Sequence, residues 1–247
     1  MTGATERATK TAPARRIWAV VPFRGPVGSK RRLSGLLSAA EREQLSLAML
    51  GGVLDVLLVS PEIERVLLLT PSPTSAIWPV HERLSVVEEP RIDGQSGEND
   101  GLNAALRHAQ DLAAASGATG LTIVPSDLPT IAGADLAAIL DAAVDAPVAI
   151  APDSAAEGTN ALLLQPPHAL VPSFGVGSFA RHRHLAEAAG LRVAVVERSG
   201  LALDLDTPDD VDLLLASGQD GAVSALLRQF VGRIVLAPQP PIPRMTS

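Results

Sequence analysis

The sequence predicts a single α/β domain built around a mostly parallel β-sheet. Short apolar runs alternate with longer amphipathic segments, which is the pattern of strands connected by crossover helices. The 247 residues suffice for one sizeable domain and are short for two. Hydrophobic residues make up 47% of the chain and aromatic residues 2%, so Ala, Val, Leu and Ile must form the core.

Each expected strand is a short apolar run bounded by polar, Gly- or Pro-containing segments. In chain order, these runs are residues 17–21, 66–69, 84–87, 121–124, 148–151, 160–164, 191–196 and 234–237. Each expected helix shows apolar residues at helical spacing or begins at a capping residue. These segments are residues 38–58, 102–115, 134–143, 177–189, 207–216 and 222–230. We interpret residues 1–16 as a flexible leader, 17–237 as one domain and 238–247 as a Pro-rich tail.

Two of the helix starts carry specific capping patterns. Ser38 followed by Glu41 forms a capping box. Thr207 suits the N-cap of a helix, and Pro208 suits its first turn. The two acidic residues that follow suit the positive end of the helix dipole.

Composition and charge exclude several classes of function. The formal net charge of −7 argues against general nucleic-acid binding, which needs a basic surface. Without Cys the chain cannot form a disulfide framework, a thiolate metal site or a Cys nucleophile. No apolar run has the length of a transmembrane helix, and none of signal-peptide length follows the basic leader. We therefore expect a cytoplasmic protein without a membrane or nucleic-acid partner.

The loop after the first expected strand is rich in Gly and basic residues. Four basic groups lie within nine residues of this loop: Arg24, Lys30, Arg31 and Arg32. Ligands of open α/β sheets bind beyond the carboxyl ends of the strands, where basic side chains can neutralise phosphate. The spacing of a Walker A motif is absent. The loop is therefore a candidate phosphate site, with a solvated basic loop as the alternative.

Acidic residues lie near two other expected elements. Asp127 follows the strand 121–124, and Asp204 and Asp206 precede a predicted helix. If the second segment is extended, both of its carboxylates point to one side, because alternate residues share a face. Carboxylate oxygens suit Mg²⁺, which usually takes one or two of them together with substrate phosphates. The alternatives are a turn-forming aspartate and acids that only stabilise a helix start.

Further polar segments carry groups that can bind an anion or a base. Thr159 follows a glycine, and Gly175 and Ser178 lie where a predicted helix begins. Such segments let a phosphate or a carboxylate meet backbone N–H donors. Asn103, at the start of another helix, could present its amide to a nucleobase. A plain loop, turn or cap is the alternative in each case.

Six motifs occur along the chain in a specific order. They are Val20-Val-Pro22 with Ser29-Lys-Arg-Arg-Leu33, Gly101-Leu-Asn103, Pro125-Ser-Asp-Leu-Pro129, Gly158-Thr-Asn160, Phe174-Gly-Val-Gly-Ser-Phe179 and Leu203-Asp-Leu-Asp-Thr-Pro208. This ordered set resembles the 2-phospho-L-lactate guanylyltransferase family, whose bacterial branch contains the phosphoenolpyruvate guanylyltransferases of coenzyme F420 biosynthesis. The resemblance covers about residues 17–215. It implies a three-layer α/β/α sandwich, Rossmann-related and glycosyltransferase-A-like, with a mixed, mostly parallel sheet.

The resemblance also implies an activity and a role for each motif. The expected reaction transfers GMP from GTP to a small phosphorylated acid and releases pyrophosphate, with Mg²⁺ as cofactor. The residues expected to hold the acid are Thr159, Gly175 and Ser178. Those expected to bind metal are Asp127, Asp204 and Asp206. Those expected to contact the nucleotide are Arg24, Lys30 and Asn103, and those expected to be catalytic are Lys30, Arg32 and Asp127.

Several alternatives stay open at this point. Arg24 replaces the Lys that the family usually has, so the planar guanidinium group of Arg takes the place of the compact ammonium group of Lys. Phosphoenolpyruvate is favoured over 2-phospho-L-lactate because the composition is typical of GC-rich bacteria. The other functions considered are a sugar-phosphate or molybdenum-cofactor nucleotidyltransferase and a GTP-binding protein without activity. The histidines give no metal pattern, since His182 and His184 are two apart on a predicted helix. The sequence does not identify the groups that read guanine, and it leaves the oligomeric state open.

Overall fold

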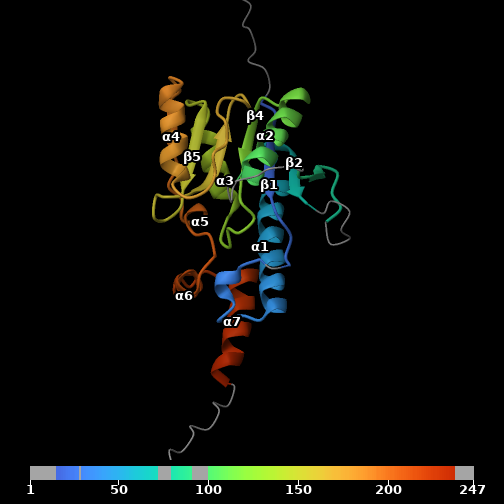
Figure 1. The fold of residues 1–247 in the computed structure, drawn as a ribbon, viewed down its shortest axis with the longest axis vertical. Helices are drawn as coiled ribbons and strands as arrows, with labels where there is room; N and C mark the ends of the chain where they lie inside the picture. The colour runs from blue at the N-terminus through green and yellow to red at the C-terminus, as the bar shows by residue number, and fades with distance from the viewer. Residues whose placement is uncertain (1–14, 28, 72–78, 91–99, 237–247) are drawn as a thin grey trace, which may run out of the picture.

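In the described part of the chain, seven strands form one mixed sheet at the centre of the molecule (Figure 1). The computed structural model describes residues 15–27, 29–71, 79–90 and 100–236. The strands are β1 (Ile17–Pro22), β2 (Ile63–Thr70), β3 (Leu84–Glu88), β4 (Gly120–Ile123), β5 (Val148–Pro152), β6 (Thr159–Leu164) and β7 (Val193–Val195). Their order is β3-β2-β1-β4-β6-β5-β7. Strand β6 is antiparallel to both of its neighbours, and every other pair is parallel.

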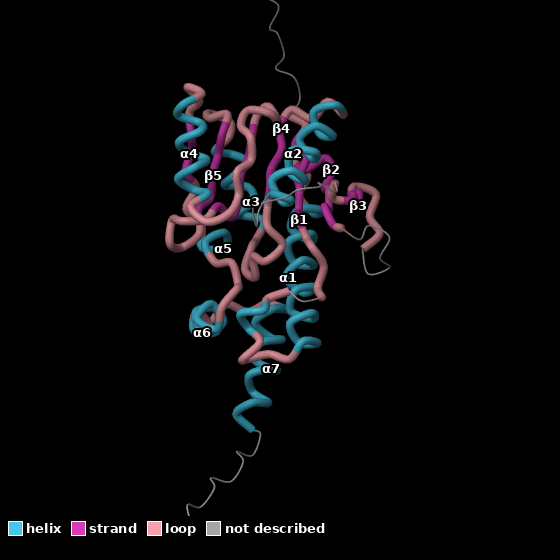
Figure 2. The backbone as a smooth tube through the Cα atoms, viewed as in Figure 1, coloured by secondary structure: helices cyan, strands magenta, loops and turns pink. Residues whose placement is uncertain are grey.

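Helices cover both faces of this sheet (Figure 2). The helical segments are the 3-10 turn η1 (Arg31–Leu33), α1 (Ala39–Val59), α2 (Asp100–Ala115), α3 (Gly133–Ala142), α4 (Ser178–Ala188), α5 (Ser199–Ala202), α6 (Pro208–Ala216) and α7 (Ala222–Leu236). Helices α1, α3 and α5 pack on one face, and α2 and α4 pack on the other. The predicted three-layer α/β/α sandwich with a mostly parallel sheet is confirmed.

The central strands are buried on both faces. In β1, Ala19 and Val21 pack in the layer of α1 and α3, whereas Val20 packs in the layer of α2. Strands of this kind have continuous apolar sequences instead of alternating ones. This is why the sequence shows apolar runs rather than a period of two.

A third apolar cluster lies beyond the carboxyl edge of the sheet. Helix α1 continues past the strands, and its first half packs with η1, α6 and α7 (Figure 1). We call these elements the helical lobe; its buried side chains include Leu33, Met49, Leu205, Leu214 and Phe230. Because α1 packs in both parts, it connects the helical lobe rigidly to the sheet.

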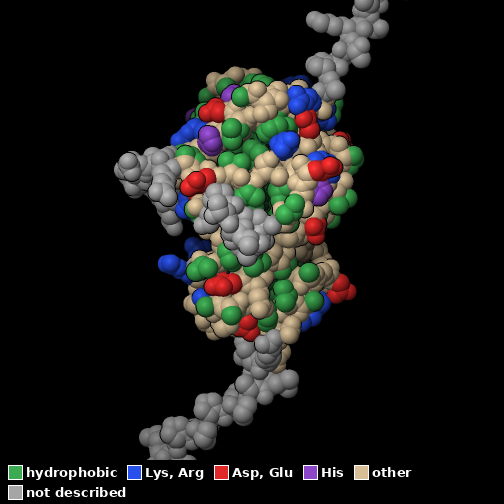
Figure 3. Space-filling model, turned by 90° about the vertical axis from the view of Figure 1, so that its right-hand side faces the viewer, with side chains coloured by type: hydrophobic (Ala, Val, Ile, Leu, Met, Phe, Trp, Pro, Cys, Tyr) green, Lys and Arg blue, Asp and Glu red, His purple; other side chains and the backbone are tan. Residues whose placement is uncertain are grey.

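The face of the molecule seen in Figure 3 carries charges of both signs. In the space-filling view, Lys, Arg, Asp and Glu side chains are scattered among apolar ones on the visible face (Figure 3). Among the described helices, none is both long and apolar enough to cross a bilayer.

One predicted strand is wrong. Residues 234–236 continue α7 as a helix, whereas residue 237 lies outside the described residues. A short apolar run fits a strand and a helix equally well, because periodicity cannot separate the two over so few positions. The sequence prediction also lacked η1 and α5, which are too short to show a periodic pattern.

Two residues of the predicted leader contact the domain. The Arg15 guanidinium donates to the Leu140 carbonyl at 2.8 Å, and the Arg16 guanidinium pairs with Glu64 at 2.6 Å. The preceding residues 1–14 and the predicted tail lie outside the described residues.

The cap of α6 generates a prediction about stability. Thr207 Oγ1 accepts a hydrogen bond from the Asp210 N–H, and the Asp210 carboxylate accepts from the Thr207 N–H at 2.7 Å. An N-cap Thr→Ala change costs about 1 kcal/mol, so Thr207→Ala should lower the free energy of unfolding by that amount. Ser38→Ala, in the matching capping box of α1, is the reference. Urea denaturation measures both, and a Thr207→Ala loss far smaller than the Ser38→Ala loss would contradict the expectation.

Candidate active site

A polar cleft lies at the carboxyl edge of the sheet, next to the helical lobe. Its volume is about 220 Å³. The lining residues come from the loops after β1 and β4, from α1 and from the start of α6: Pro22, Phe23, Arg24, Gly25, Ser29, Lys30, Ser46, Met49, Ser126, Asp127 and Asp206. Parallel strands end at the same edge, so segments that are distant in the sequence meet there.

Lys30 links three of these segments. Its ammonium nitrogen lies 2.7 Å from Asp127 Oδ2 and 2.5 Å from Asp206 Oδ1, and its side chain is 9% exposed. The Lys30 backbone is left-handed, with φ of 51° and ψ of 43°, which is uncommon for a residue with a side chain. Strain of this kind costs about 1–3 kcal/mol and occurs most often at functional sites. The strained position directs the ammonium group across the cleft instead of into solvent.

Backbone contacts bring the second acidic segment to Asp127. The Leu205 N–H donates to the Asp127 carbonyl at 3.2 Å, so the two segments touch directly. The Asp206 N–H donates to the Asp210 carboxylate at 3.0 Å, which fixes Asp206 relative to the start of α6. The structure thus brings Asp127 and Asp206 together beside Lys30, as expected from the sequence.

The pKa values of Lys30 and Asp204 are both raised, from different causes. Burial alone would lower the pKa of Lys30, but the charges of Asp127 and Asp206, together with the hydrogen bonds to them, outweigh burial and raise it. The pKa of Asp204 is raised first by burial and then by the charge of Asp127, while a hydrogen bond from Asn160 opposes the rise. Lys30 is therefore charged at neutral pH, and Asp204 lies close enough to sense the other carboxylates.

The carboxylates suit a hard divalent cation, although they do not form a closed set of ligands. Across the described ranges, no group of three or more His, Asp or Glu side chains is arranged to hold a metal ion. The Lys30 ammonium lies between Asp127 and Asp206 instead. Mg²⁺ usually takes one or two carboxylates and completes its shell with water and substrate phosphates, so the oxygen donors at this edge fit its chemistry.

An irregular strand pairing brings a second polar cluster next to the first. The pairing of β5 with β6 shifts between Ala151 and Pro152. Their partners on β6 are Ala161 and Thr159, so Asn160 is an extra residue of β6 at this point. Bulges of this kind re-aim side chains near active sites. Asn160, which follows Thr159, donates to Asp204 Oδ1 at 3.4 Å, so the two clusters adjoin through consecutive residues of β6.

Thr159, Ser178 and His182 form the hydrogen-bonded centre of this second cluster. Thr159 Oγ1 lies 3.0 Å from His182 Nδ1, and Ser178 Oγ donates to Thr159 Oγ1 at 3.2 Å. All three side chains are buried. Two of the residues expected to hold the acid therefore contact one another, and one of them, Thr159, also contacts His182.

The loop that leads into α4 is held by side chains of two helices. Asn103 Nδ2 donates to the Phe174 carbonyl at 3.1 Å, and the Phe174 N–H donates to Asn103 Oδ1 at 2.7 Å. The Arg181 guanidinium donates to the carbonyls of Ser173 and Val176. The structure thus engages the Asn103 amide with the protein backbone, and its expected contact with the nucleotide stays a prediction.

Glycine is required at two positions of this loop. Gly175 has a φ of +119° and Gly177 a φ of +71°, which side chains other than hydrogen adopt only with strain. These turns bring the Ser178 N–H to the Gly175 carbonyl at 2.9 Å, at the first residue of α4. Gly175 therefore shapes the cluster through its backbone.

Two basic residues lie apart from the Lys30 ion pairs. Arg24 lines the cleft, is exposed and lies 3.9 Å from Glu89 at the end of β3. Burial raises the pKa of Glu89, which the Arg24 charge opposes. Arg32, in η1, is exposed. Among the contacts described, none joins Arg32 to the carboxylates, so its expected role beside Lys30 stays a prediction.

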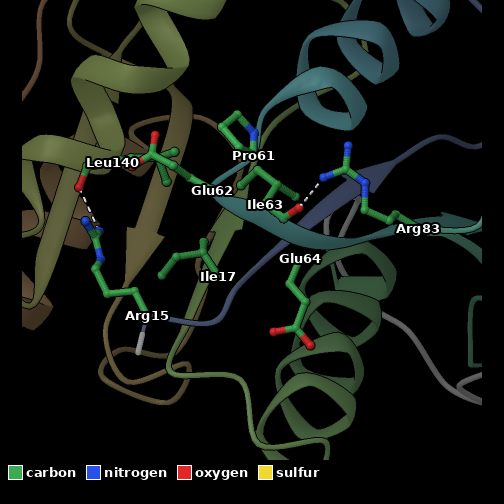
Figure 4. Close-up of a pocket in the computed structure, with 8 residues that line it drawn as sticks. All are labelled: Arg15, Ile17, Pro61, Glu62, Ile63, Glu64, Arg83 and Leu140. Atoms are coloured by element: carbon green, nitrogen blue, oxygen red, sulfur yellow. Dashed lines mark hydrogen bonds between the residues drawn. The ribbon is translucent and has the colours of Figure 1, made fainter. Parts of the chain in front are cut away.

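A larger hollow, of about 440 Å³, lies at the opposite edge of the sheet, where β1 and β2 begin (Figure 4). Its two arginines donate to backbone carbonyls: Arg15 to Leu140 and Arg83 to Ile63. The smaller cleft at the carboxyl edge is the better candidate, because ligands of open α/β sheets bind at that edge and because Lys30, Asp127 and Asp206 meet there.

Sequence analysis missed His182 and Glu89. A signal for His182 was available, since it follows Ser178 by four residues and so lies on the same helical face. The spacing of His182 from His184 carries no sign of this contact, because residues two apart on a helix do not share a face. Glu89 had no such signal, because its burial depends on contacts between distant segments.

Comparison with known proteins gives consistent findings. Residues 17–239 match the family model described as guanylyl transferase CofC like. The phosphoenolpyruvate guanylyltransferase of Rubrobacter xylanophilus is 44% identical over 206 residues, which cover 82% of this chain and 95% of that protein. The 2-phospho-L-lactate guanylyltransferase of Methanothermobacter thermautotrophicus is 36% identical over 212 residues, which cover 86% and 90%. A candidate nucleotide-diphospho-sugar transferase from Desulfovibrio desulfuricans has a similar fold, with a TM-score of 0.71, 15% identity and coverage of 89% and 98%.

The buried histidine generates a prediction about pH. Burial, and then the charge of Arg181, lower the pKa of His182 to about 4. An unfolded histidine takes up a proton below about pH 6.5, so the neutral ring stabilises the fold fully above that pH and progressively less as the pH falls to 4.

Urea denaturation of the wild type and of His182→Gln, at pH 7 and pH 5, tests this expectation. The stability advantage of the wild type should shrink by about 2 kcal/mol at pH 5, since each pH unit in this window corresponds to 1.36 kcal/mol. An advantage of equal size at both pH values would contradict it.

Proposed function

The chain belongs to the family of CofC-like guanylyl transferases, and we propose that it transfers GMP from GTP to a small phosphorylated carboxylic acid. Phosphoenolpyruvate is the favoured acceptor, and the product would serve coenzyme F420 biosynthesis. The observation that carries the proposal is the pair of adjoining clusters at one edge of the sheet. One presents Lys30 beside carboxylates, and the other presents the hydroxyls of Thr159 and Ser178.

The proposed reaction is an in-line displacement at the α-phosphorus of GTP. An oxygen of the acid's phosphate forms the new bond, and the bond from the α-phosphorus to the bridging oxygen breaks, so its electron pair leaves with pyrophosphate. The nucleophile is already anionic near neutral pH, so no strong general base is needed. Alignment and charge neutralisation then account for the rate.

Lys30 supplies a fixed positive charge to this reaction. Its pKa is raised by Asp127 and Asp206 against the effect of burial, so the ammonium group stays protonated while phosphates enter and leave. Its two ion pairs also fix its position, and preorganised charge contributes most when it need not reorganise during the reaction. Lys30 and Arg32 are proposed to stabilise the charge that develops on pyrophosphate.

Asp127, Asp204 and Asp206 are the residues proposed to hold Mg²⁺, which when bound neutralises and orients the phosphates. Arg24 and Asn103 are proposed to contact the nucleotide, although the Asn103 amide already bonds to the Phe174 backbone. Thr159, Ser178 and the backbone around Gly175 are proposed to hold the acid.

An acceptor panel tests the activity and its class. Pyrophosphate release from GTP is measured with phosphoenolpyruvate, 2-phospho-L-lactate, 3-phosphoglycerate, a sugar phosphate, and no acceptor. We expect release that depends on a phosphorylated acid and is fastest with phosphoenolpyruvate. Release with the sugar phosphate alone would favour the sugar-phosphate enzyme, and GTP binding without release would favour a silent binding protein.

Asp204→Asn tests the role of the acidic segment. Removing a metal-binding carboxylate should cost about 3 kcal/mol of transition-state stabilisation, or roughly a hundredfold in turnover. Folding should survive, because burial and neighbouring charge already disfavour the ionised form of Asp204. Turnover is measured across a range of Mg²⁺ concentrations.

Asp209→Asn is the matched control, since Asp209 is an exposed acid in the first turn of α6. It removes the same charge nearby and should leave turnover almost unchanged. Near-normal turnover of Asp204→Asn at limiting Mg²⁺ would reject the metal role.

A further inference from the structure

We propose that His182 is a positioning residue for the acceptor acid. As the tautomer with its hydrogen on Nδ1, it donates to Thr159 Oγ1 and so directs the Thr159 hydroxyl hydrogen toward an oxygen of the acid. This inference rests on the proposed function, because it requires that Thr159 contact the acceptor.

The tautomer follows from the partner of the other ring nitrogen. The Ser173 N–H donates to His182 Nε2 at 2.9 Å, so Nε2 must offer a lone pair. A neutral imidazole with a free lone pair on Nε2 carries its hydrogen on Nδ1. The 3.0 Å contact between Nδ1 and Thr159 Oγ1 is therefore a hydrogen bond in which the histidine donates and the threonine accepts.

The Thr159 hydroxyl then has a defined direction. A hydroxyl has two acceptor lone pairs and one hydrogen. His182 Nδ1 donates to one lone pair, and Ser178 Oγ donates to the other at 3.2 Å. In the part of the chain that the structure describes, no protein group is recorded as accepting the Thr159 hydrogen, so this hydrogen is left for a ligand.

Because Thr159 is buried, leaving its hydroxyl hydrogen without an acceptor is energetically costly. Thr159 is 4% exposed and Ser178 is 2% exposed, so the donor has little access to bulk water. An unsatisfied buried donor is costly, and a hydrogen bond to a charged acceptor is stronger than one to a neutral acceptor. A carboxylate or phosphate oxygen is the ligand group that such a donor favours.

Several contacts hold the His182 ring in this orientation. Its position on α4, four residues after Ser178, places both side chains on one helical face. The Phe174 ring lies edge-on at 5.0 Å between centroids. Arg181 holds the loop that carries Ser173, so the N–H that selects the tautomer is itself fixed.

Two substitutions of His182 distinguish the roles of its two ring nitrogens. The amide of His182→Gln reaches the place of Nε2, so it can accept from Ser173 but cannot donate to Thr159. The amide of His182→Asn occupies the place of Nδ1 and can donate to Thr159. We expect His182→Gln to raise KM for the acceptor about tenfold with KM for GTP unchanged, and His182→Asn to raise it less.

A double-mutant cycle with Thr159→Val tests whether His182 acts through the hydroxyl. If it does, His182→Gln should add little to the acceptor KM of Thr159→Val, because the hydroxyl that it positions is already gone. An equal increase in both backgrounds would show a merely structural role and overturn the proposal. An unchanged acceptor KM in His182→Gln alone would also overturn it.

An imidazole ¹⁵N–¹H correlation spectrum of the wild type at pH 7 tests the tautomer without any activity. The expected result is a hydrogen on Nδ1 of His182, and a hydrogen on Nε2 would overturn the proposal. Failure of the proposed function is a different outcome, since the wild type would then transfer GMP to none of the acids, and the positioning role would fail with it.

Discussion

The ion pairs of Lys30 hold the cleft together, because they join segments that are distant in the sequence. Asp127 lies 97 residues from Lys30, and Asp206 lies 176 residues from it. Without the ammonium group between them, the two carboxylates would repel each other in a partly desolvated cleft. A buried charge that loses its partner destabilises a protein more than the pair stabilises it. The loops after β1 and β4 and the start of α6 are therefore constrained to keep their places together.

The same ion pairs set a requirement for binding the proposed nucleotide, GTP. Lys30 is already matched by two carboxylates, and Asp204 adds a third acid that senses them. A triphosphate brings several more negative charges to this edge, so the cleft needs further positive charge before the nucleotide can bind closely. Arg24 lines the cleft and supplies part of it. A divalent cation between the carboxylates and the phosphates would supply the rest, which is the physical ground for the proposed Mg²⁺.

The sequence predicted those features that depend on local pattern and on sheet topology. Apolar runs and capping residues gave the elements, and the carboxyl-edge rule placed Lys30 near Asp127. Features that depend on packing between distant elements could not be predicted. The β5–β6 bulge beside Thr159, the engagement of Asn103 with the loop before α4, and the partners of His182 are of this kind. The wrong strand near the carboxyl end has a different cause, because a four-residue apolar run has no period to read.

The second cluster differs from the first in using neutral donors. His182 has a pKa lowered to about 4, so its ring is uncharged at neutral pH, and the guanidinium of Arg181 is directed to loop carbonyls. An anion held mainly by hydroxyl and backbone N–H groups is selected by geometry more than by charge, because such bonds weaken steeply with misalignment. If the second cluster holds the acid as proposed, small shifts of Thr159 or of the loop around Gly175 change which acid fits. Relatives of this chain are named for different phosphorylated acids, as this kind of recognition allows.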